Sequence, residues 1–314
     1  MSNNFRSNAE IIVKANVTGE IFECKEGLSF WGGVDPSTGC IVDVHHMNHG
    51  NSLVGKLVLM PTSRGSCSGS GVLLQLMQNG LAPKALIFHE EEEILTLGAI
   101  VSDQLFNKKV AILRVSKDIY SDLATADTAE IFENTLVFGS KTIKLWGLDT
   151  ETLYLNSTDR SMLNGDQGIA NKIAMEAICK MAAVQSANEL IDVTKGHIDG
   201  CILAHDANLI FAEKMYKLGA NVSIPTTINA ISVNLNNWEN QGVEPDFGNK
   251  ASRLANAYEK MGAHPTYTCA PYLLEDKPQR DEVIGWSESN AVIYANSIFC
   301  LLYTSDAADD DACV

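Results

Sequence analysis

The sequence has no apolar run near the roughly 20 residues that a membrane-spanning helix requires. Residues 1–6 also lack the apolar core of a secretory signal. We therefore expect no membrane partner and a cytoplasmic location. With 314 residues, 46% of them hydrophobic, the chain is long enough to bury one or two cores, and two domains are expected.

Clusters of positive charge are also missing. The 23 Lys and Arg residues are outnumbered by 39 Asp and Glu residues, which gives a formal net charge of −16. Because an acidic chain repels phosphate backbones, this composition argues against a nucleic-acid partner.

The eight cysteines include no C-x-x-C pair, so the common paired metal-binding spacing is absent. Cys269 differs from the others because it lies in a polar loop between Pro265 and Pro271. A thiolate in such a loop could bind iron.

The end of the sequence differs in character from the rest. Residues 300–309 resemble the translation of a transposase-based sequencing-library adapter, and the apolar stretch 291–299 passes without a linker into the acidic residues 306–311. We expect residues 300–314 to be a non-native tail and the natural protein to continue past Phe299. The alternative is a genuine acidic C-terminus.

Residues 9–115 have the pattern of a β-rich domain with one or two helices. Alternation at Val13, Ala15 and Val17 indicates a strand. Further expected elements are strands at 56–60, 85–88 and 110–113, and helices at 71–80 and 94–106. This order predicts a compact β/β/α domain over residues 1–115.

The following stretch, 116–157, is polar and mixed, and is expected to connect two domains. Residues 158–299 then show helical spacing at 161–186, 209–218 and 250–261, with short strands expected at 190–193 and 222–225. Repeated helix-Gly-strand units are typical of an α/β layer fold.

The most informative local motif is the Gly- and Ser-rich stretch 61–71, which joins an expected strand to an expected helix. Backbone N–H groups at such a helix start favour anions, and Arg64 adds a bidentate donor for a carboxylate. Ser66, Ser68 and Ser70 supply hydroxyl groups for acid–base chemistry or hydrogen bonding. The stretch fits neither a P-loop nor a dinucleotide fingerprint, and Cys67 replaces the serine of a G-x-S-x-G elbow. The alternative is a turn that only caps the helix.

Two clusters of metal-binding residue types are less specific. The glutamate run 90–93 could bind a metal, but a solvated helix start is favoured because acids suit that position. His45, His46 and His49 could also do so, but no carboxylate or cysteine spacing supports a site.

In the second region, polar groups follow expected strands, where α/β folds place their ligands. They are His197 in the stretch 197–200, and Thr226 and Asn229 in 225–230. Glu288 lies in a further polar cluster, 286–291, next to an apolar run. Each cluster alone is equally compatible with capping or with a satisfied turn.

Taken together, these segments resemble the aconitase X family. The stretches 28–36 and 64–70 resemble its small swivel domain, and 162–165, 197–200, 225–230, 269–274 and 286–291 resemble the start of its large catalytic domain. The resemblance implies an α/β protein. An N-terminal swivelling β/β/α domain would be followed by the incomplete start, over 158–299, of an aconitase-like α/β/α catalytic domain.

The order of the two domains resembles the fused type of aconitase X, which implies cis-3-hydroxy-L-proline dehydratase activity. The implied reaction is an iron-assisted elimination of water from a small hydroxy acid, giving Δ1-pyrroline-2-carboxylate. Relatives with separate subunits are mevalonate 5-phosphate dehydratases, which is the alternative substrate. Phosphate binding would favour more Lys or Arg residues near the pocket than Arg64 alone.

The resemblance also implies roles for particular residues. Ser66 would be the base, with Ser68 as second choice, and Arg64 would hold the substrate carboxylate. Cys269 would ligate iron or an iron–sulfur cluster. Substrate-pocket positions are implied for His197, Thr226, Asn229 and Glu288.

One departure is Ser63, where the family usually has glycine. The family's remaining cluster cysteines would follow Phe299, so the 314-residue chain by itself is expected to be inactive. Two other classes of function are a phosphoryl carrier, disfavoured because 61–71 contains no histidine, and a non-catalytic swivel or binding module.

Overall fold

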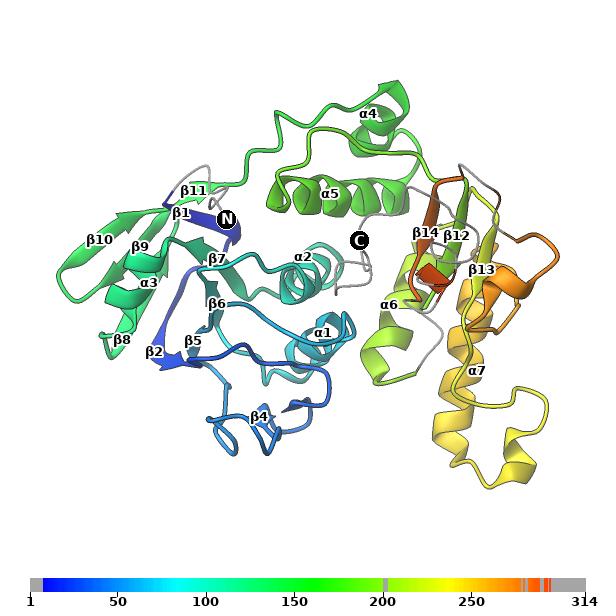
Figure 1. The fold of residues 1–314 in the computed structure, drawn as a ribbon, viewed down its shortest axis with the longest axis horizontal. Helices are drawn as coiled ribbons and strands as arrows, with labels where there is room; N and C mark the ends of the chain where they lie inside the picture. Colours follow the sequence, from blue (N-terminus) through cyan, green and yellow to red (C-terminus); the bar gives the residue numbers. More distant parts are fainter. Residues whose placement is uncertain are drawn as a thin grey trace. The chain divides into compact units, whose positions relative to one another are not determined.

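The computed structural model describes residues 8–199, 203–277, 279, 282–288, 291, 292 and 294 (Figure 1). The chain forms two compact units. Unit 1 comprises Met1–Asn156 and Met175–Leu190, and unit 2 comprises Ser157–Ala174 and Ile191–Val314. Within the described residues, no helix has the length and apolar character needed to cross a membrane.

Unit 1 is built on a nine-stranded sheet with strand order β10-β9-β8-β2-β5-β6-β7-β1-β11. The strands are β1 (Ala9–Val13), β2 (Val17–Glu23), β5 (Leu57–Leu59), β6 (Ala85–Phe88), β7 (Ala111–Val115), β8 (Thr128–Phe132), β9 (Thr135–Phe138), β10 (Lys141–Lys144) and β11 (Trp146–Gly147). Strands β2, β5, β6 and β7 run parallel to one another, and β1 and β8 pair antiparallel at either side of them. A separate hairpin contains β3 (Val34–Asp35) and β4 (Cys40–Ile41).

Both faces of the central strands are buried, as parallel sheets require. On one face, Val58, Leu86 and Ile112 pack against helices α1 (Gly69–Asn79) and α2 (Ile94–Phe106). On the other, Leu57, Leu59 and neighbouring side chains pack with α3 (Lys117–Leu123) and with β8 and β9. Successive side chains of β5 point to opposite faces of the sheet, so the core of unit 1 consists of two layers, one on each face.

The segment 116–157, expected to be a connection, instead contributes α3 and strands β8 to β11 to unit 1. Strand β8 alternates exposed and buried residues, and it buries Ala129 and Ile131 against the sheet. Short alternating strands at the edge of a sheet carry a weak sequence signal, which explains the difference.

Unit 2 contains a three-stranded parallel sheet of order β13-β12-β14. Its strands are β12 (Lys195–Ile198), β13 (Thr226–Ile228) and β14 (Ile284–Trp286). Helices α6 (Asp206–Lys217) and α7 (Pro245–Lys260) form a core with Ile198 and Ile228. Two short 3-10 helices are η1 (Trp238–Gln241) and η2 (Pro271–Leu273).

Several boundaries differ from those expected. The helix predicted over 161–186 is two helices, α4 (Ser157–Asn164) and α5 (Ile169–Val184). The break falls at Gly165 and Gly168, whose φ angles of 88° and 99° are incompatible with a continuous helix. The strand expected at 222–225 begins only at Thr226, after Pro225, which has no N–H to donate. Residues 190–193 form no strand, and β12 begins at Lys195.

Candidate active site

Alternate residues of the unit 2 sheet point to the face opposite the Ile198 and Ile228 side chains that contact α6 and α7. The strand registers arrange these residues in rows across the sheet, because His197 pairs with both Thr227 and Trp286. The first row contains Lys195 and Ile284, and the second contains His197, Thr227 and Trp286. We call the third the polar row; it lies just beyond the strand ends and contains Asp199, Asn229 and Glu288.

A single amide joins the polar row. The Asn229 side-chain Nδ2 donates to Asp199 Oδ1 at 2.7 Å and to Glu288 Oε2 at 2.9 Å. The Asn229 side-chain oxygen accepts from the Ala230 N–H at 2.7 Å, and its backbone N–H donates to the Ile198 carbonyl at 2.9 Å. Asn229 is fully buried, so its orientation is set by these bonds and both carboxylates are held beside it.

Ser287 connects the end of β14 to the end of β12 through two hydrogen bonds. The Asp199 backbone N–H donates to Ser287 Oγ at 2.8 Å, and the Ser287 hydroxyl donates to the His197 carbonyl. Burial raises the pKa of Asp199 to about 6; the Asn229 hydrogen bond opposes this shift and the nearby Glu288 charge adds to it. The row therefore holds two acidic groups that repel one another when both are ionised.

His197 is a neutral ring beside this acidic row. It is 4% exposed, and its Nδ1 lies 2.8 Å from Thr227 Oγ1. Its Nε2 is buried and has no hydrogen-bond partner within the described part of the chain. Burial lowers the pKa of His197 to about 4, although the Glu288 carboxylate opposes the shift, so the imidazole is uncharged at neutral pH.

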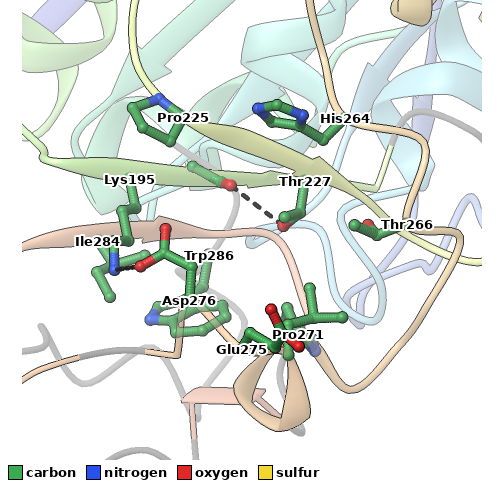
Figure 2. Close-up of a pocket in the computed structure, with 12 residues that line it drawn as sticks. Lys195, Pro225, Thr227, His264, Thr266, Pro271, Glu275, Asp276, Ile284 and Trp286 are labelled. Carbon is green, nitrogen blue, oxygen red and sulfur yellow. Dashed lines mark hydrogen bonds and ion pairs between the residues drawn. The ribbon is translucent and has the colours of Figure 1, made fainter.

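A cavity of about 490 Å³ opens on the same face of the sheet (Figure 2). Lys195, Thr227, Ile284 and Trp286 from the first two rows line it, together with residues between His264 and Asp276. Figure 2 shows the Lys195 ammonium directed at Asp276, 2.7 Å from Oδ1, and Glu282 Oε2 lies 3.4 Å from the same nitrogen. The volume suits a small ligand, but the cation in its wall is already paired.

Thr226 does not face this cavity, although the sequence analysis placed it in a substrate pocket. Its hydroxyl donates to the Ile224 carbonyl at 2.9 Å, and its side chain packs over Gly196. The next residue, Thr227, lines the cavity instead. Strand alternation sends the two threonines to opposite faces, and only the register shows which one faces the cavity.

Cys269, the predicted iron ligand, is an exposed free thiol just before η2. Across the residues that the structure describes, no three His, Cys, Asp or Glu side chains gather as a metal site would require. The described residues therefore do not fit an iron centre by themselves.

In unit 1, the Ser-rich loop lies between β5 and α1, as its sequence predicts. Ser66 is exposed; its hydroxyl donates to Ser68 Oγ at 3.2 Å and its oxygen accepts from the Ser68 N–H at 3.2 Å. Gly65 has a φ of 89°, and a Cβ there would lie 2.4 Å from Ser29 Oγ. Glycine is therefore required for the close turn that presents Ser66 at the start of α1.

Arg64 extends beside two carboxylates in the same unit. Its guanidinium is half-exposed, 3.5 Å from Asp43 Oδ2 and 4.0 Å from Glu26 Oε2. The pKa of Asp43 is lowered, mainly by the His45 N–H and further by the Arg64 charge. These contacts are too long for a tight bidentate pair, which leaves Arg64 able to bind an external carboxylate.

Glu92 is a residue whose position the sequence analysis missed. The glutamate run was expected to be solvated, but Glu92 is buried, while Glu90 and Glu91 are exposed. Its carboxylate accepts from Ser63 Oγ at 2.7 Å and from the Leu95 and Thr96 N–H groups at 2.6 and 2.9 Å. Burial raises the pKa of Glu92, and these hydrogen bonds oppose the shift. Ser63 thus connects the start of the Ser-rich loop to α2.

Two family models match the chain. The aconitase X swivel domain matches residues 6–138, and the aconitase X first domain matches residues 152–313. The chain belongs to the aconitase X family. The swivel-domain match lies within unit 1, while the first-domain match covers unit 2 and the segment Met175–Leu190. The predicted α/β class, with a swivel domain before an aconitase-like domain, is confirmed.

Curated relatives in this aconitase X group are dehydratases. The chain is 42% identical over 301 residues to the cis-3-hydroxy-L-proline dehydratase of Hypocrea jecorina and 42% identical over 294 residues to that of Pseudomonas aeruginosa. Each alignment covers 91% of the chain and 50% of the relative, so the chain spans about half the length of these relatives. It is also 31% identical over 148 residues to the phosphomevalonate dehydratase large subunit of Methanothermobacter thermautotrophicus, covering 46% of the chain and 37% of that subunit.

Proposed function

We propose that the complete protein containing this chain is a hydro-lyase that dehydrates cis-3-hydroxy-L-proline to Δ1-pyrroline-2-carboxylate. The observation that supports this substrate is the extent of the similarity. Identity of 42% to cis-3-hydroxy-L-proline dehydratases runs through both units in a single alignment. Phosphomevalonate dehydratases match the chain only as separate subunits, at 31% identity over 148 residues for the large subunit and 50% over 86 residues for the small subunit of Pyrococcus abyssi. A cytoplasmic location and an iron centre that includes Cys269 stay predictions.

In the proposed reaction, Ser66 removes the proton from Cα and the 3-hydroxyl group leaves. The proton and the leaving hydroxide together make one water, and the enamine that remains tautomerises to the cyclic imine. A neutral serine hydroxyl is too weak a base, so Ser66 would act as its alkoxide and would pass the Cα proton on to the leaving hydroxide. The negative charge on Ser66 Oγ therefore needs stabilising before the proton is taken. The Ser68 N–H, 3.2 Å away, and the positive end of α1 supply favourable electrostatics there.

Arg64 has a different part in this proposal, which is to hold the substrate carboxylate. Fixing that group would also stabilise the negative charge that spreads into it when the Cα proton leaves. The long separations from Asp43 and Glu26 support this role, because the guanidinium can exchange them for a closer carboxylate.

The test is the variant Ser66→Ala in the complete protein, with turnover of cis-3-hydroxy-L-proline measured as kcat and KM. We expect kcat to fall by about 10²–10⁴-fold, the usual contribution of a positioned acid–base group. The matched control is Ser121→Ala, which removes an exposed hydroxyl on α3 of the same unit and should leave kcat unchanged. A Ser66→Ala enzyme within threefold of the parent would exclude Ser66 as the base.

The substrate is tested in parallel by offering mevalonate 5-phosphate. A higher kcat/KM for mevalonate 5-phosphate would overturn the proposed substrate while keeping the reaction type. No turnover of either compound by the folded, complete protein would favour a non-catalytic binding module.

A further inference from the structure

Two carboxylates beside the Arg64 guanidinium in unit 1 are held in the same way. Glu26 Oε1 accepts from the Met47 N–H at 3.0 Å, and Asp43 Oδ1 accepts from the His45 N–H at 2.9 Å. The other oxygen of each acid faces Arg64, with Glu26 Oε2 4.0 Å from Nη1 and Asp43 Oδ2 3.5 Å from Nη2. Backbone donors of one short segment therefore fix both acids next to Arg64.

The stem of Arg64 is also held in place, so its charged end is the part that can change partner. The Arg64 backbone N–H donates to the Leu28 carbonyl at 3.4 Å. A Cβ added at Gly27 would lie 3.7 and 3.8 Å from the Cβ and Cδ of Arg64, so the stem packs over the Gly27 backbone. Because the contacts of the guanidinium with its two carboxylates are long, a third carboxylate can bind it more closely.

His46 lies in the same short segment, and its hydrogen bonding is incomplete. The residue is 2% exposed, and its Nδ1 accepts from the Asn48 N–H at 3.1 Å, so the ring proton is on Nε2. This buried Nε2 has no hydrogen-bond partner within the part of the chain that the structure describes, and Glu26 Oε1 lies 3.9 Å from it. A hydrogen bond would need a distance about 1 Å shorter. Because a buried donor normally has a partner, the free N–H indicates a second position for the Glu26 carboxylate.

We propose that His46 is a positioning residue for substrate binding and that it acts through Glu26. In the free protein the Glu26 carboxylate faces Arg64. When the substrate carboxylate binds Arg64, Glu26 moves toward His46 and accepts a hydrogen bond from Nε2–H. The displaced carboxylate thereby keeps a charge-assisted hydrogen bond, and the buried N–H gains the partner that it lacks. This inference rests on the proposed function, in which Arg64 holds the substrate carboxylate, and it concerns unit 1 alone.

Two substitutions of His46 separate this role from a purely structural one. Asparagine can place an acceptor oxygen where Nδ1 lies, and it has no group at the position of Nε2. Glutamine can place an amide N–H near the position of Nε2, but it loses the acceptor for Asn48. If His46 positions Glu26, then His46→Asn should be the more damaging change and His46→Gln should preserve binding. If His46 only holds its own turn through Asn48, the order should be reversed.

The measurement is the Kd of L-proline, an unreactive analogue that keeps the carboxylate, determined for the complete protein by titration calorimetry. We expect His46→Asn to raise Kd about 10- to 100-fold, as for the loss of a hydrogen bond to a charged group, and His46→Gln to stay within about threefold of the parent. With cis-3-hydroxy-L-proline as substrate, KM should rise by a similar factor in His46→Asn. The value of kcat should change by less than about threefold, because the bond is present in the ground state and the transition state alike.

A second measurement tests whether His46 acts through Glu26. In a Glu26→Ala background, His46→Asn should change Kd by less than about twofold, because no carboxylate remains to accept from Nε2. The matched control is His49→Asn, which alters an exposed histidine near His46 and should leave Kd unchanged. Folding of each variant is checked by circular dichroism. An unchanged Kd in folded His46→Asn, a greater loss in His46→Gln, or a full effect in the Glu26→Ala background would overturn the inference.

The outcomes also separate the inference from the proposed function. Turnover of cis-3-hydroxy-L-proline by the parent, with an unchanged Kd in His46→Asn, would keep the function and reject the role of His46. Weaker L-proline binding in His46→Asn but not in His46→Gln, without turnover by the parent, would keep the role of His46 and reject the function. Failure of the parent protein to bind L-proline would reject the role of His46 outright.

Discussion

Replacing Arg114 with methionine should lower the free energy of unfolding of unit 1 by about 3–5 kcal/mol, because Glu10 would stay buried without its counter-charge. The two residues face one another across β1 and β7. Arg114 Nε and Nη2 donate to Glu10 Oε2 at 3.0 and 2.7 Å, and Nη1 donates to the Val184 carbonyl at 3.0 Å. Both side chains are less than a tenth exposed.

The size of the effect follows from burial and not from the distance between the charges. Lys141 and Asp122 form an even shorter pair, at 2.5 Å, but each is about half exposed. Water already solvates both of those charges, so Lys141→Met should cost only about 0–1 kcal/mol. Comparing the two variants in one protein separates desolvation from simple charge loss.

The double variant Glu10→Leu with Arg114→Met provides the decisive comparison. Removing both charges eliminates the uncompensated carboxylate, so the double variant should be more stable than Arg114→Met alone. The assay is urea denaturation at pH 7 followed by circular dichroism, with the free energy extrapolated to water. A loss below 1 kcal/mol for Arg114→Met, or a double variant less stable than the single one, would refute this reasoning.

Three further outcomes are expected. Because the pKa of Asp199 is raised, the folded state binds its proton more tightly than the unfolded state does. The contribution of Asp199 to the free energy of unfolding should therefore fall as the pH rises from about 4 to 6. The variant Asp199→Asn should abolish that trend when unfolding is measured as a function of pH. His197 has a lowered pKa, so its contribution changes in the opposite direction, and stability should be lost as the pH falls from about 6.5 to 4. The variant His197→Gln should flatten this part of the plot of unfolding free energy against pH. An unchanged plot would contradict a buried neutral ring. Gly98→Ala should destabilise unit 1 by about 1–3 kcal/mol in thermal unfolding, because the new Cβ would lie 2.6 Å from the Ser70 carbonyl oxygen; no loss would mean that α1 and α2 can move apart freely.

Local patterns predicted the helices well where one segment contains its own start and stop signals. The helix expected at 94–106 is α2, with the bounds Ile94–Phe106, and it ends where Asn107 adopts a left-handed conformation. The strand expected at 85–88 is β6. These elements depend on periodicity and end residues within a short window, and such information is present in the sequence.

Predictions that depended on distant neighbours were less complete. The sequence indicated polar clusters around His197, Asn229 and Glu288, and the structure brings these stretches together, with His197 inside β12 and not after a strand. It did not indicate Asp199 as a member of the group, nor that Asn229 bonds to residues 30 and 59 positions away. The resemblance implied a pocket position for Thr226, whereas Thr227 lines the cavity, and only the strand register shows which of the two threonines faces it.

By itself, the sequence determined the family resemblance, the α/β class and the Ser-rich loop before a helix, since these depend on residue order and short-range spacing. Only the tertiary structure decided that Glu92 is buried under Ser63 and that Asp199, Asn229 and Glu288 form one row. The physical reason is that burial and strand register result from the packing of segments far apart in the chain. A one-residue change of register would send the side chains of a whole strand to the other face.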